Sequence, residues 1–160
     1  MFSLCSFCFI IELGGKIKMI KLTSVKSKEE EKAVIEFLEN YFLRNNFDTN
    51  GLTYMMIEDN KLVGVCGVDI EGYFNELKYV IVSEKRRGLN YGEALLRSVM
   101  FNMEDMGYFQ IFYQDKNDYL LKKGFSETNE SNGEKTFSLK CDIPYIMNKK
   151  CCNGAGSNGI

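Results

Sequence analysis

The segment Glu76–Glu93, ELKYVIVSEKRRGLNYGE, contains three local patterns in succession. Residues 76–82 form an apolar run with three consecutive β-branched side chains, which predicts a β-strand. Residues 86–92 form a short basic loop with two glycines, and a helical pattern begins at Glu93. Because a strand, a tight loop and a helix in this order direct several backbone N–H groups at one point, the segment predicts an anion-binding site.

The composition excludes several classes of function. The chain has 160 residues, a formal net charge of −2 and no histidine. The length suits one domain, and the charge gives no global positive field of the kind that nucleic-acid-binding proteins show. Without histidine, Ser-His-Asp and Cys-His nucleophiles and histidine-containing metal sites are excluded, and no metal is expected. General-base chemistry falls to a carboxylate, a tyrosine, a lysine or water.

Six cysteines are scattered along the chain. Cys5 and Cys8 have the C-x-x-C spacing of a redox pair or of half a metal site, but they lie within the first ten residues, whereas a redox pair should follow a strand and open a helix. Cys66 lies in an apolar strand pattern, which is typical of a small buried hydrophobe. This cysteine usage favours the reducing cytoplasm as the compartment.

The first residues differ from the middle of the chain. Residues 1–13 are apolar, but they lack a basic n-region and fall short of the roughly 20 residues of a membrane span. Two glycines precede Met19 by a few residues, and their codons could spell a bacterial ribosome-binding sequence. We therefore hypothesise that Met19 is the true start, so that residues 1–18 are a non-native leader or a disordered extension, and we expect no membrane association.

The remaining pattern predicts one domain, residues 19–142, followed by a flexible tail, residues 143–160, that becomes rich in Gly, Asn and Ser. Ser27 and Glu30 form a capping-box signature at the start of a helix. The expected strands are 20–25, 52–58, 61–70, 76–82, 109–113, 125–128 and 136–140, and the expected helices run from 28 to about 42, over 93–106 and over 117–123.

This order of elements, together with two motifs, resembles the GNAT acyl-CoA N-acyltransferases. Their signature R/Q-x-x-G-x-G/A after a strand is matched by Arg87-Gly88-Leu89-Asn90-Tyr91-Gly92. A second element, a strand, a short helix and a Gly-Phe pair, is matched by residues 111–113 and 119–125. The resemblance implies an α/β fold in which a mixed, mostly antiparallel, twisted sheet with splayed central strands is flanked by helices. Asn90 departs from the usual glycine, but asparagine tolerates a left-handed backbone best among the other residues.

The resemblance also implies acetyl-CoA as co-substrate. Backbone amides at the helix start would hold the pyrophosphate, and the exposed edge of the preceding strand would pair with the pantetheine arm. Lys85 and its two arginine neighbours would add positive charge, although a solvated basic turn is the alternative. The implied cofactor-binding residues are Val80, Val82, Arg87, Gly88, Leu89, Asn90, Tyr91, Gly92 and Glu93.

Two residues are candidates for proton transfer by the same resemblance. Glu76 lies eleven residues before Arg87, where histone-acetylating members carry their general base. The alternative is that Glu76 begins an edge strand and faces water. Tyr119 is the candidate acid for the leaving thiolate, but Leu120 occupies the register of the family's tyrosine, so Tyr119 could instead face the core, since one residue turns a helix by about 100°.

The implied function is N-acetyl transfer from acetyl-CoA to a primary amine of a small molecule or peptide. The alternative is a catalytically weak acyl-CoA-binding regulatory module. The acceptor is not readable, since the nearby anions Asp48 and Glu58 could attract a cationic amine or be solvated loop carboxylates. Oligomeric state stays open, a homodimer included, and no nucleic-acid partner is expected.

Overall fold

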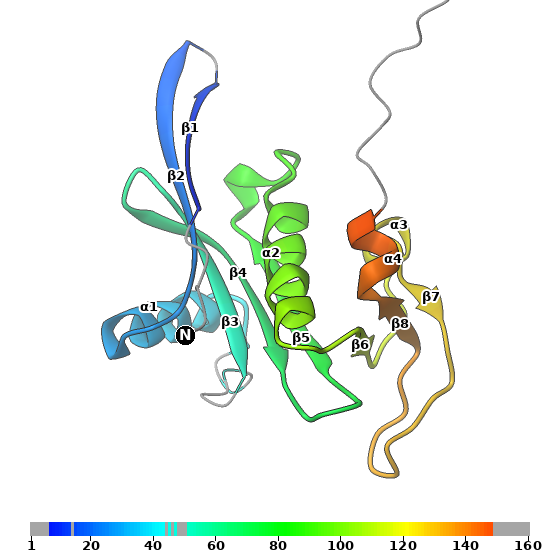
Figure 1. Cartoon of the computed structure of the whole chain (residues 1–160). Coiled ribbons are helices and arrows are strands. Elements are labelled where there is room, and N and C mark those ends of the chain that lie inside the picture. Colours follow the sequence, from blue (N-terminus) through cyan, green and yellow to red (C-terminus); the bar gives the residue numbers. More distant parts are fainter. Residues whose placement is uncertain (1–6, 14, 44, 46, 48–50, 149–160) are drawn as a thin grey trace, which may run out of the picture.

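The computed structural model describes residues 7–13, 15–43, 45, 47 and 51–148. Figure 1 shows the elements along the chain. The strands are β1 (Phe7–Leu13), β2 (Lys16–Ser24), β3 (Leu52–Glu58), β4 (Lys61–Asp69), β5 (Glu76–Val82), β6 (Gln110–Tyr113), β7 (Ser126–Glu127) and β8 (Leu139–Asp142). The helices are α1 (Lys28–Glu39), α2 (Tyr91–Asp105), α3 (Asp118–Lys122) and α4 (Ile143–Asn148), with a short 3-10 helix η2 (Glu84–Arg86).

The described strands form one mixed sheet in the order β1-β2-β3-β4-β5-β6-β8-β7. All neighbours pair antiparallel except β5 and β6, which are parallel and are joined by the crossover helix α2. This is the mixed, mostly antiparallel sheet flanked by helices that the sequence predicts, so the predicted fold class is confirmed. β5 and β6 share one register pair, Glu76 with Phe112, and so diverge beyond it.

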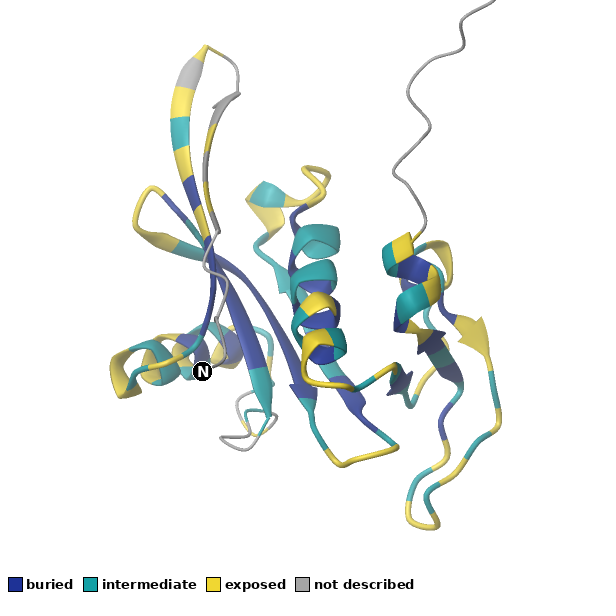
Figure 2. Ribbon diagram, viewed as in Figure 1, coloured by how far each residue is buried: buried dark blue, intermediate teal, exposed yellow. Residues whose placement is uncertain are grey.

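The two faces of the sheet carry different helices. Val65 and Cys66 are adjacent in β4 and therefore point to opposite faces. Val65 packs with Val34 and Leu38 of α1, whereas Cys66 packs under α2. Figure 2 shows that the middle of the sheet and the inner faces of these helices are buried. The second half of β2 is mostly buried as well, while the end of the β1–β2 hairpin near its turn is largely exposed where it is described.

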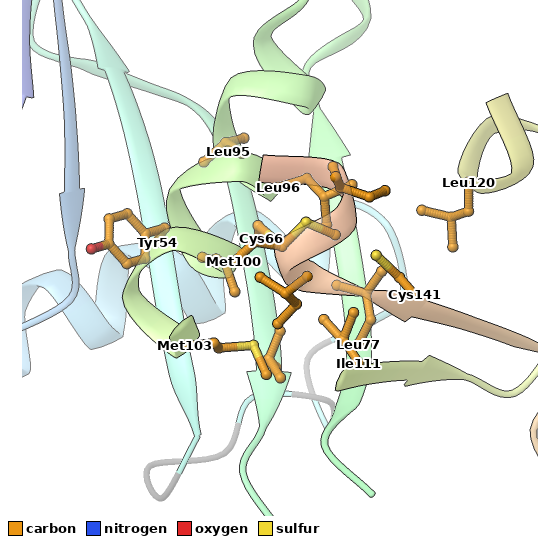
Figure 3. Close-up of a cluster of buried hydrophobic side chains, with 14 of the residues drawn as sticks. Tyr54, Cys66, Leu77, Leu95, Leu96, Met100, Met103, Ile111, Leu120 and Cys141 are labelled. Carbon is orange, nitrogen blue, oxygen red and sulfur yellow. The ribbon is translucent and has the colours of Figure 1, made fainter. Parts of the chain in front are cut away.

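The main core lies between α2 and the sheet. Apolar residues recur at three- and four-residue intervals along α2, and one face of the helix is buried as the pattern predicts. Figure 3 shows these side chains meeting Cys66, Leu77, Ile111 and Cys141 from the strands. Complete burial of one such leucine contributes about 1.5–3 kcal/mol, which explains why α2 is fixed firmly over β4 and β5.

Local sequence signals account for several element boundaries. The capping box is present, because Ser27 Oγ accepts from the Glu30 N–H at 3.2 Å and the Glu30 carboxylate accepts from the Ser27 N–H at 3.2 Å. The β3–β4 turn places Asp59 and Asn60 at φ of 48° and 65°, as a tight hairpin requires. The helix α1 ends at Glu39, earlier than predicted.

Three segments differ from the sequence prediction. Residues 7–13 form β1 and pair with β2, so the expectation of disorder does not hold for them. The hypothesis that Met19 starts the native chain stays a prediction. Residues 143–148, assigned to the flexible tail, form α4 and bury Ile143 and Ile146 against the main core. Residues 149–160 lie outside the described part. The last hairpin is shifted, with β7 shortened to two residues and β8 beginning at Leu139.

Candidate active site

The divergence of β5 from β6 leaves the outer edge of β5 open. Ser83 N–H donates to Val63 O of the β4 side at 2.8 Å. Because backbone groups alternate in direction along a strand, those of Val80 and Val82 point the other way, toward the gap. A cavity of about 350 Å³ lies here, lined by Val80, Val82, Arg86, Arg87, Gly88, Asn90, Tyr91, Gly92, Tyr119 and Lys123. Seven of the nine predicted cofactor-binding residues thus line one cavity, and Leu89 and Glu93 are the two that do not.

The loop after β5 has the backbone conformation that its sequence requires. Gly88 has φ of 82°, and Asn90 adopts the left-handed conformation at φ 59° and ψ 17°. Asn90 therefore fills the place of the family's glycine without preventing the loop from forming. It is the N-cap residue of α2, and its side chain makes no capping hydrogen bond, so the first N–H groups of α2 keep no side-chain cap. These groups and the helix dipole favour an anion in the cavity.

The basic residues of the loop have different roles in the structure. Arg87 Nε donates to the Val82 carbonyl at 3.2 Å, so this side chain reaches back over the open edge of β5. Arg86 Nε donates to Glu58 Oε2 at 2.8 Å. Arg86 and Arg87 line the cavity, whereas Lys85 is exposed and is not among its lining residues. Arg86 is half-buried and bonded to Glu58, so it is not a simply solvated turn residue. Arg87 is exposed, and the solvated-turn alternative stays open for it and for Lys85.

Tyr119 faces the cavity and not the core. Its side chain is 40% exposed, while the neighbouring Leu120 is 3% exposed and belongs to the main core. A Cβ built on Gly92 would lie 2.7 Å from the Tyr119 hydroxyl, so this hydroxyl reaches the first turn of α2, next to Val80. Burial raises the pKa of Tyr119, and the nearby Glu93 carboxylate adds to the effect. The phenol is therefore held in its protonated form.

Lys123 is a cavity residue that the sequence interpretation did not identify. Its Nζ lies 2.5 Å from Glu93 Oε2 and 5.5 Å from the centroid of the Tyr119 ring. Arg97 Nε bonds the other Glu93 oxygen at 3.0 Å. The hydrogen bond from Lys123, with that from Arg97, lowers the pKa of Glu93 despite partial burial. Glu93 thus fixes the positions of the Lys123 and Arg97 side chains beside the cavity.

Glu76 lies at the root of the gap and is buried, with 4% of the residue exposed. The alternative that it faces water is therefore wrong. Its carboxylate is ion-paired, with Lys135 Nζ 2.7 Å from Oε2 and Lys78 Nζ 3.4 Å from Oε1. Glu76 does not line the cavity, and it precedes Val80 by four positions, about 13 Å along β5.

Of the two candidate anions for acceptor binding, Glu58 is the one that lies in the described part of the chain. Asp48 lies outside the described residues. Glu58 is 3% exposed at the end of β3 and is neither a solvated loop carboxylate nor a free attractor of amines. It accepts hydrogen bonds from Lys18 at 2.6 Å, Arg86 at 2.8 Å and Tyr91 at 3.0 Å. The partners of Glu58 come from distant segments, so local sequence patterns gave no signal for this cluster.

The two core thiols of the described part are shielded from solvent. Cys66 and Cys141 are buried, and burial raises the pKa of both thiols, that of Cys141 to about 12. Within residues 7–148, as far as they are described, no three or more Cys, Asp or Glu side chains gather as a metal site would require. None of the helices in the described part is both long and apolar enough to cross a membrane.

Solved structures with the same fold are numerous and distant in sequence. Tetrahymena GCN5 matches with a TM-score of 0.62 and 16% identity, over 76% of this chain and 95% of that one. A GNAT-family acetyltransferase from Staphylococcus aureus matches with a TM-score of 0.59 and 16% identity, over 76% and 99%. The PaiA N-acetyltransferase of Thermoplasma acidophilum, solved in complex with coenzyme A, matches with a TM-score of 0.57 and 14% identity, over 76% and 98%.

Sequence comparison gives the family directly. No curated protein matches the chain significantly. The model of the acetyltransferase (GNAT) family matches residues 19–122, which include β5, the loop and α2. The matched range is well over half of the chain, and the splayed β5–β6 pair and the left-handed loop agree with the expected fold. The chain therefore belongs to the GNAT family of acetyltransferases, an acyltransferase class.

Proposed function

We propose that this protein transfers an acetyl group from acetyl-CoA to a primary amine of a small molecule or peptide. The observation that carries the proposal is the cavity of about 350 Å³ between the open edge of β5 and the start of α2. It combines strand backbone that is not paired with β6, a helix N-terminus and two arginines. A long thiol ester with a charged pyrophosphate needs this combination of groups.

The described residues fit coenzyme A in two ways. The amides of residues 89–93 and the guanidinium of Arg87 would bind the pyrophosphate, because N–H groups at a helix start and a cation both favour phosphate oxygens. Val80 and Val82 would pair with the pantetheine amides as an added strand. The Val82 carbonyl now accepts from Arg87, so the guanidinium would move toward the pyrophosphate when the arm pairs with β5. The fold neighbour PaiA, solved with coenzyme A, supports this choice of ligand.

The chemistry needs a donor that stabilises the oxyanion, a base and an acid. The Val80 N–H would stabilise the negative charge that develops on the thioester oxygen while the amine nitrogen bonds to the carbonyl carbon. Tyr119 would give its proton to the sulfur as the C–S bond breaks, and its raised pKa keeps that proton in place at neutral pH. The free thiol and the N-acetyl amine leave, and Tyr119 regains a proton from solvent.

Glu76 would accept the proton that the ammonium form of the acceptor must lose, directly or through water. A lysine-like amine has a pKa near 10.4, so deprotonation needs such a base at neutral pH. In the structure the carboxylate is held by Lys135 and Lys78. For Glu76 to act, the Lys135 ammonium would first have to give way to the acceptor.

The ion pair of Glu76 is also the observation that favours the second candidate, a catalytically weak acyl-CoA-binding regulatory module. If Lys135 stays on Glu76, the protein would bind the co-substrate and transfer slowly. The two functions share the cofactor site and differ only in turnover.

Two measurements test the proposal. Isothermal titration with acetyl-CoA should give saturable binding, and absence of heat at millimolar ligand would refute both candidates. Thiol release from acetyl-CoA should then be followed with a panel of amines, polyamines, aminoglycosides and peptides. Turnover with any of these amines supports the transferase, while tight binding with no thiol release above hydrolysis across the panel supports the regulatory module.

A further inference from the structure

Glu58 is a buried carboxylate that takes no part in the proposed chemistry. It bonds the loop that joins β5 to α2. It lies at the end of β3, and it bonds residues on both sides of the turn over residues 87–90. Arg86 Nε and the Tyr91 hydroxyl both donate to the same oxygen, Oε2, at 2.8 Å and 3.0 Å. One acceptor atom therefore ties together the two residues that flank the turn.

The second oxygen of Glu58 is also engaged. Lys18 Nζ of β2 lies 2.6 Å from Oε1. Burial raises the pKa of Glu58, but the hydrogen bonds from Lys18, Arg86 and Tyr91 outweigh it and leave the pKa below the usual value. Burial and the bond to Glu58 raise the pKa of Tyr91 to about 12. The acceptor is thus ionised and the phenol is protonated, as these bonds require.

We infer that Glu58 is a positioning residue for coenzyme A binding, which fixes the turn at residues 87–90 through Arg86 and Tyr91. Arg86 and Tyr91 line the cavity, whereas Glu58 does not. Glu58 acts from the β3 side on a loop whose own sequence contains Gly88 and the left-handed Asn90. We call the bonds from Arg86 and Tyr91 to Glu58 the clamp. Such a loop has few local restraints, so the N–H groups at the start of α2 would lose their common direction without the clamp.

The inference rests on the proposed function for its ligand. Whether coenzyme A binds more weakly or more tightly once Glu58 loses its charge distinguishes the clamp from a purely electrostatic effect. Removing the negative charge of Glu58 leaves two cations, Arg86 and Lys18, without their partner. Coulomb's law alone then predicts tighter binding of an anionic cofactor. Loss of the clamp predicts weaker binding, because the free energy of ordering the loop must come from the ligand.

The experiment uses Glu58→Gln and Tyr91→Phe in the full chain, with Glu130→Gln as the control. Glu130 is an ion-paired carboxylate on the β7–β8 side, bonded to Lys140 at 2.6 Å. Amide hydrogen exchange over residues 87–92 is measured without ligand, and coenzyme A binding is measured by calorimetry. Tyr91→Phe changes no charge and keeps the ring, so it tests the clamp even if Glu58→Gln fails to fold.

For Glu58→Gln we expect faster exchange in the loop and a dissociation constant for coenzyme A raised about tenfold, the loss of roughly one charge-assisted hydrogen bond. Tyr91→Phe should change both in the same direction by less, and Glu130→Gln should change neither. In turnover, the KM for acetyl-CoA should rise while the KM for the amine stays constant. Unchanged or tighter binding in both loop variants would overturn the inference. If the wild-type chain binds no coenzyme A, the proposed function fails, and unchanged exchange over residues 87–92 would separately overturn the clamp.

Discussion

Replacing Gly92 by alanine should lower turnover without lowering the stability of the fold. A Cβ at this position would lie 2.7 Å from the Tyr119 hydroxyl and 3.6 Å from Val80 Cγ1. The second distance is an ordinary contact, but the first is not, so the tyrosine must move. Since the hydroxyl is the outer end of a side chain that is 40% exposed, the fold can accommodate this movement.

The size of each effect follows from the position. Gly92 lies in the first turn of α2, where alanine stabilises a helix relative to glycine by up to about 1 kcal/mol. The free energy of unfolding should therefore stay constant or rise slightly. Turnover should fall about tenfold or more, because the proposed general acid is displaced and such catalysis contributes at least that much in most enzymes. Urea unfolding measures the first quantity and thiol release the second.

A double-mutant cycle with Tyr119→Phe tests the cause. Without the hydroxyl, the nearest tyrosine atom is Cζ at 3.5 Å from the new methyl, an ordinary contact. Gly92→Ala should then have little further effect on turnover in the Tyr119→Phe background. An equal loss in both backgrounds would show that the methyl acts on the co-substrate and not on Tyr119. Wild-type turnover in Gly92→Ala would refute the placement of Tyr119 as the acid.

Three further predictions follow from the buried groups. Glu76→Gln should lower turnover by about tenfold or more with coenzyme A affinity nearly intact, and an unchanged pH–rate profile would rule out Glu76 as the base. Leu95→Ala should lower the free energy of unfolding by about 2–5 kcal/mol in urea, because the side chain is fully buried, and a loss under 1 kcal/mol would contradict its place in the core. The depressed pKa of Glu58 contributes stability above its unfolded value near 4.5 that is lost as pH falls further. Glu58→Gln should therefore make stability less pH-dependent below about pH 4.5. Thermal melts measure this, and a melting temperature that falls more steeply with decreasing pH in the variant than in the wild type would refute the sign.

The central elements are readable from sequence because their signals are local. The bounds of β5 follow from a β-branched run, and the start of α1 follows from the capping box at Ser27. The loop conformation follows from Gly88 and Asn90, whose residue types permit left-handed backbone. These signals operate over a few residues, so no knowledge of distant contacts is needed.

The ion pairs of the site are not readable in this way. Lys135 reaches Glu76 across 59 positions, and Lys123 reaches Glu93 across 30. Each lysine alone resembles a solvated surface charge, and only the packing of the sheet brings it to its partner. The same reason applies to Glu58, which the sequence presents as a polar residue before a turn and the structure places at the centre of three bonds.

The helix α4 was missed for a related reason. Residues 143–148 form a helix of only six residues, which is too short to show a clear helical period in the sequence. Burial of Ile143 and Ile146 against the α2 core stabilises this segment, so its stability comes from tertiary packing and not from its own propensity.

The most direct test of the account is acetyl-CoA titration followed by amide NMR. We predict one saturable site per chain, with the largest shifts at Val80, Val82 and the amides of residues 89–93. These are the groups that would pair with the pantetheine arm and bind the pyrophosphate. Absence of binding at millimolar acetyl-CoA, or shifts confined to another surface of the protein, would contradict the proposed site between β5 and α2.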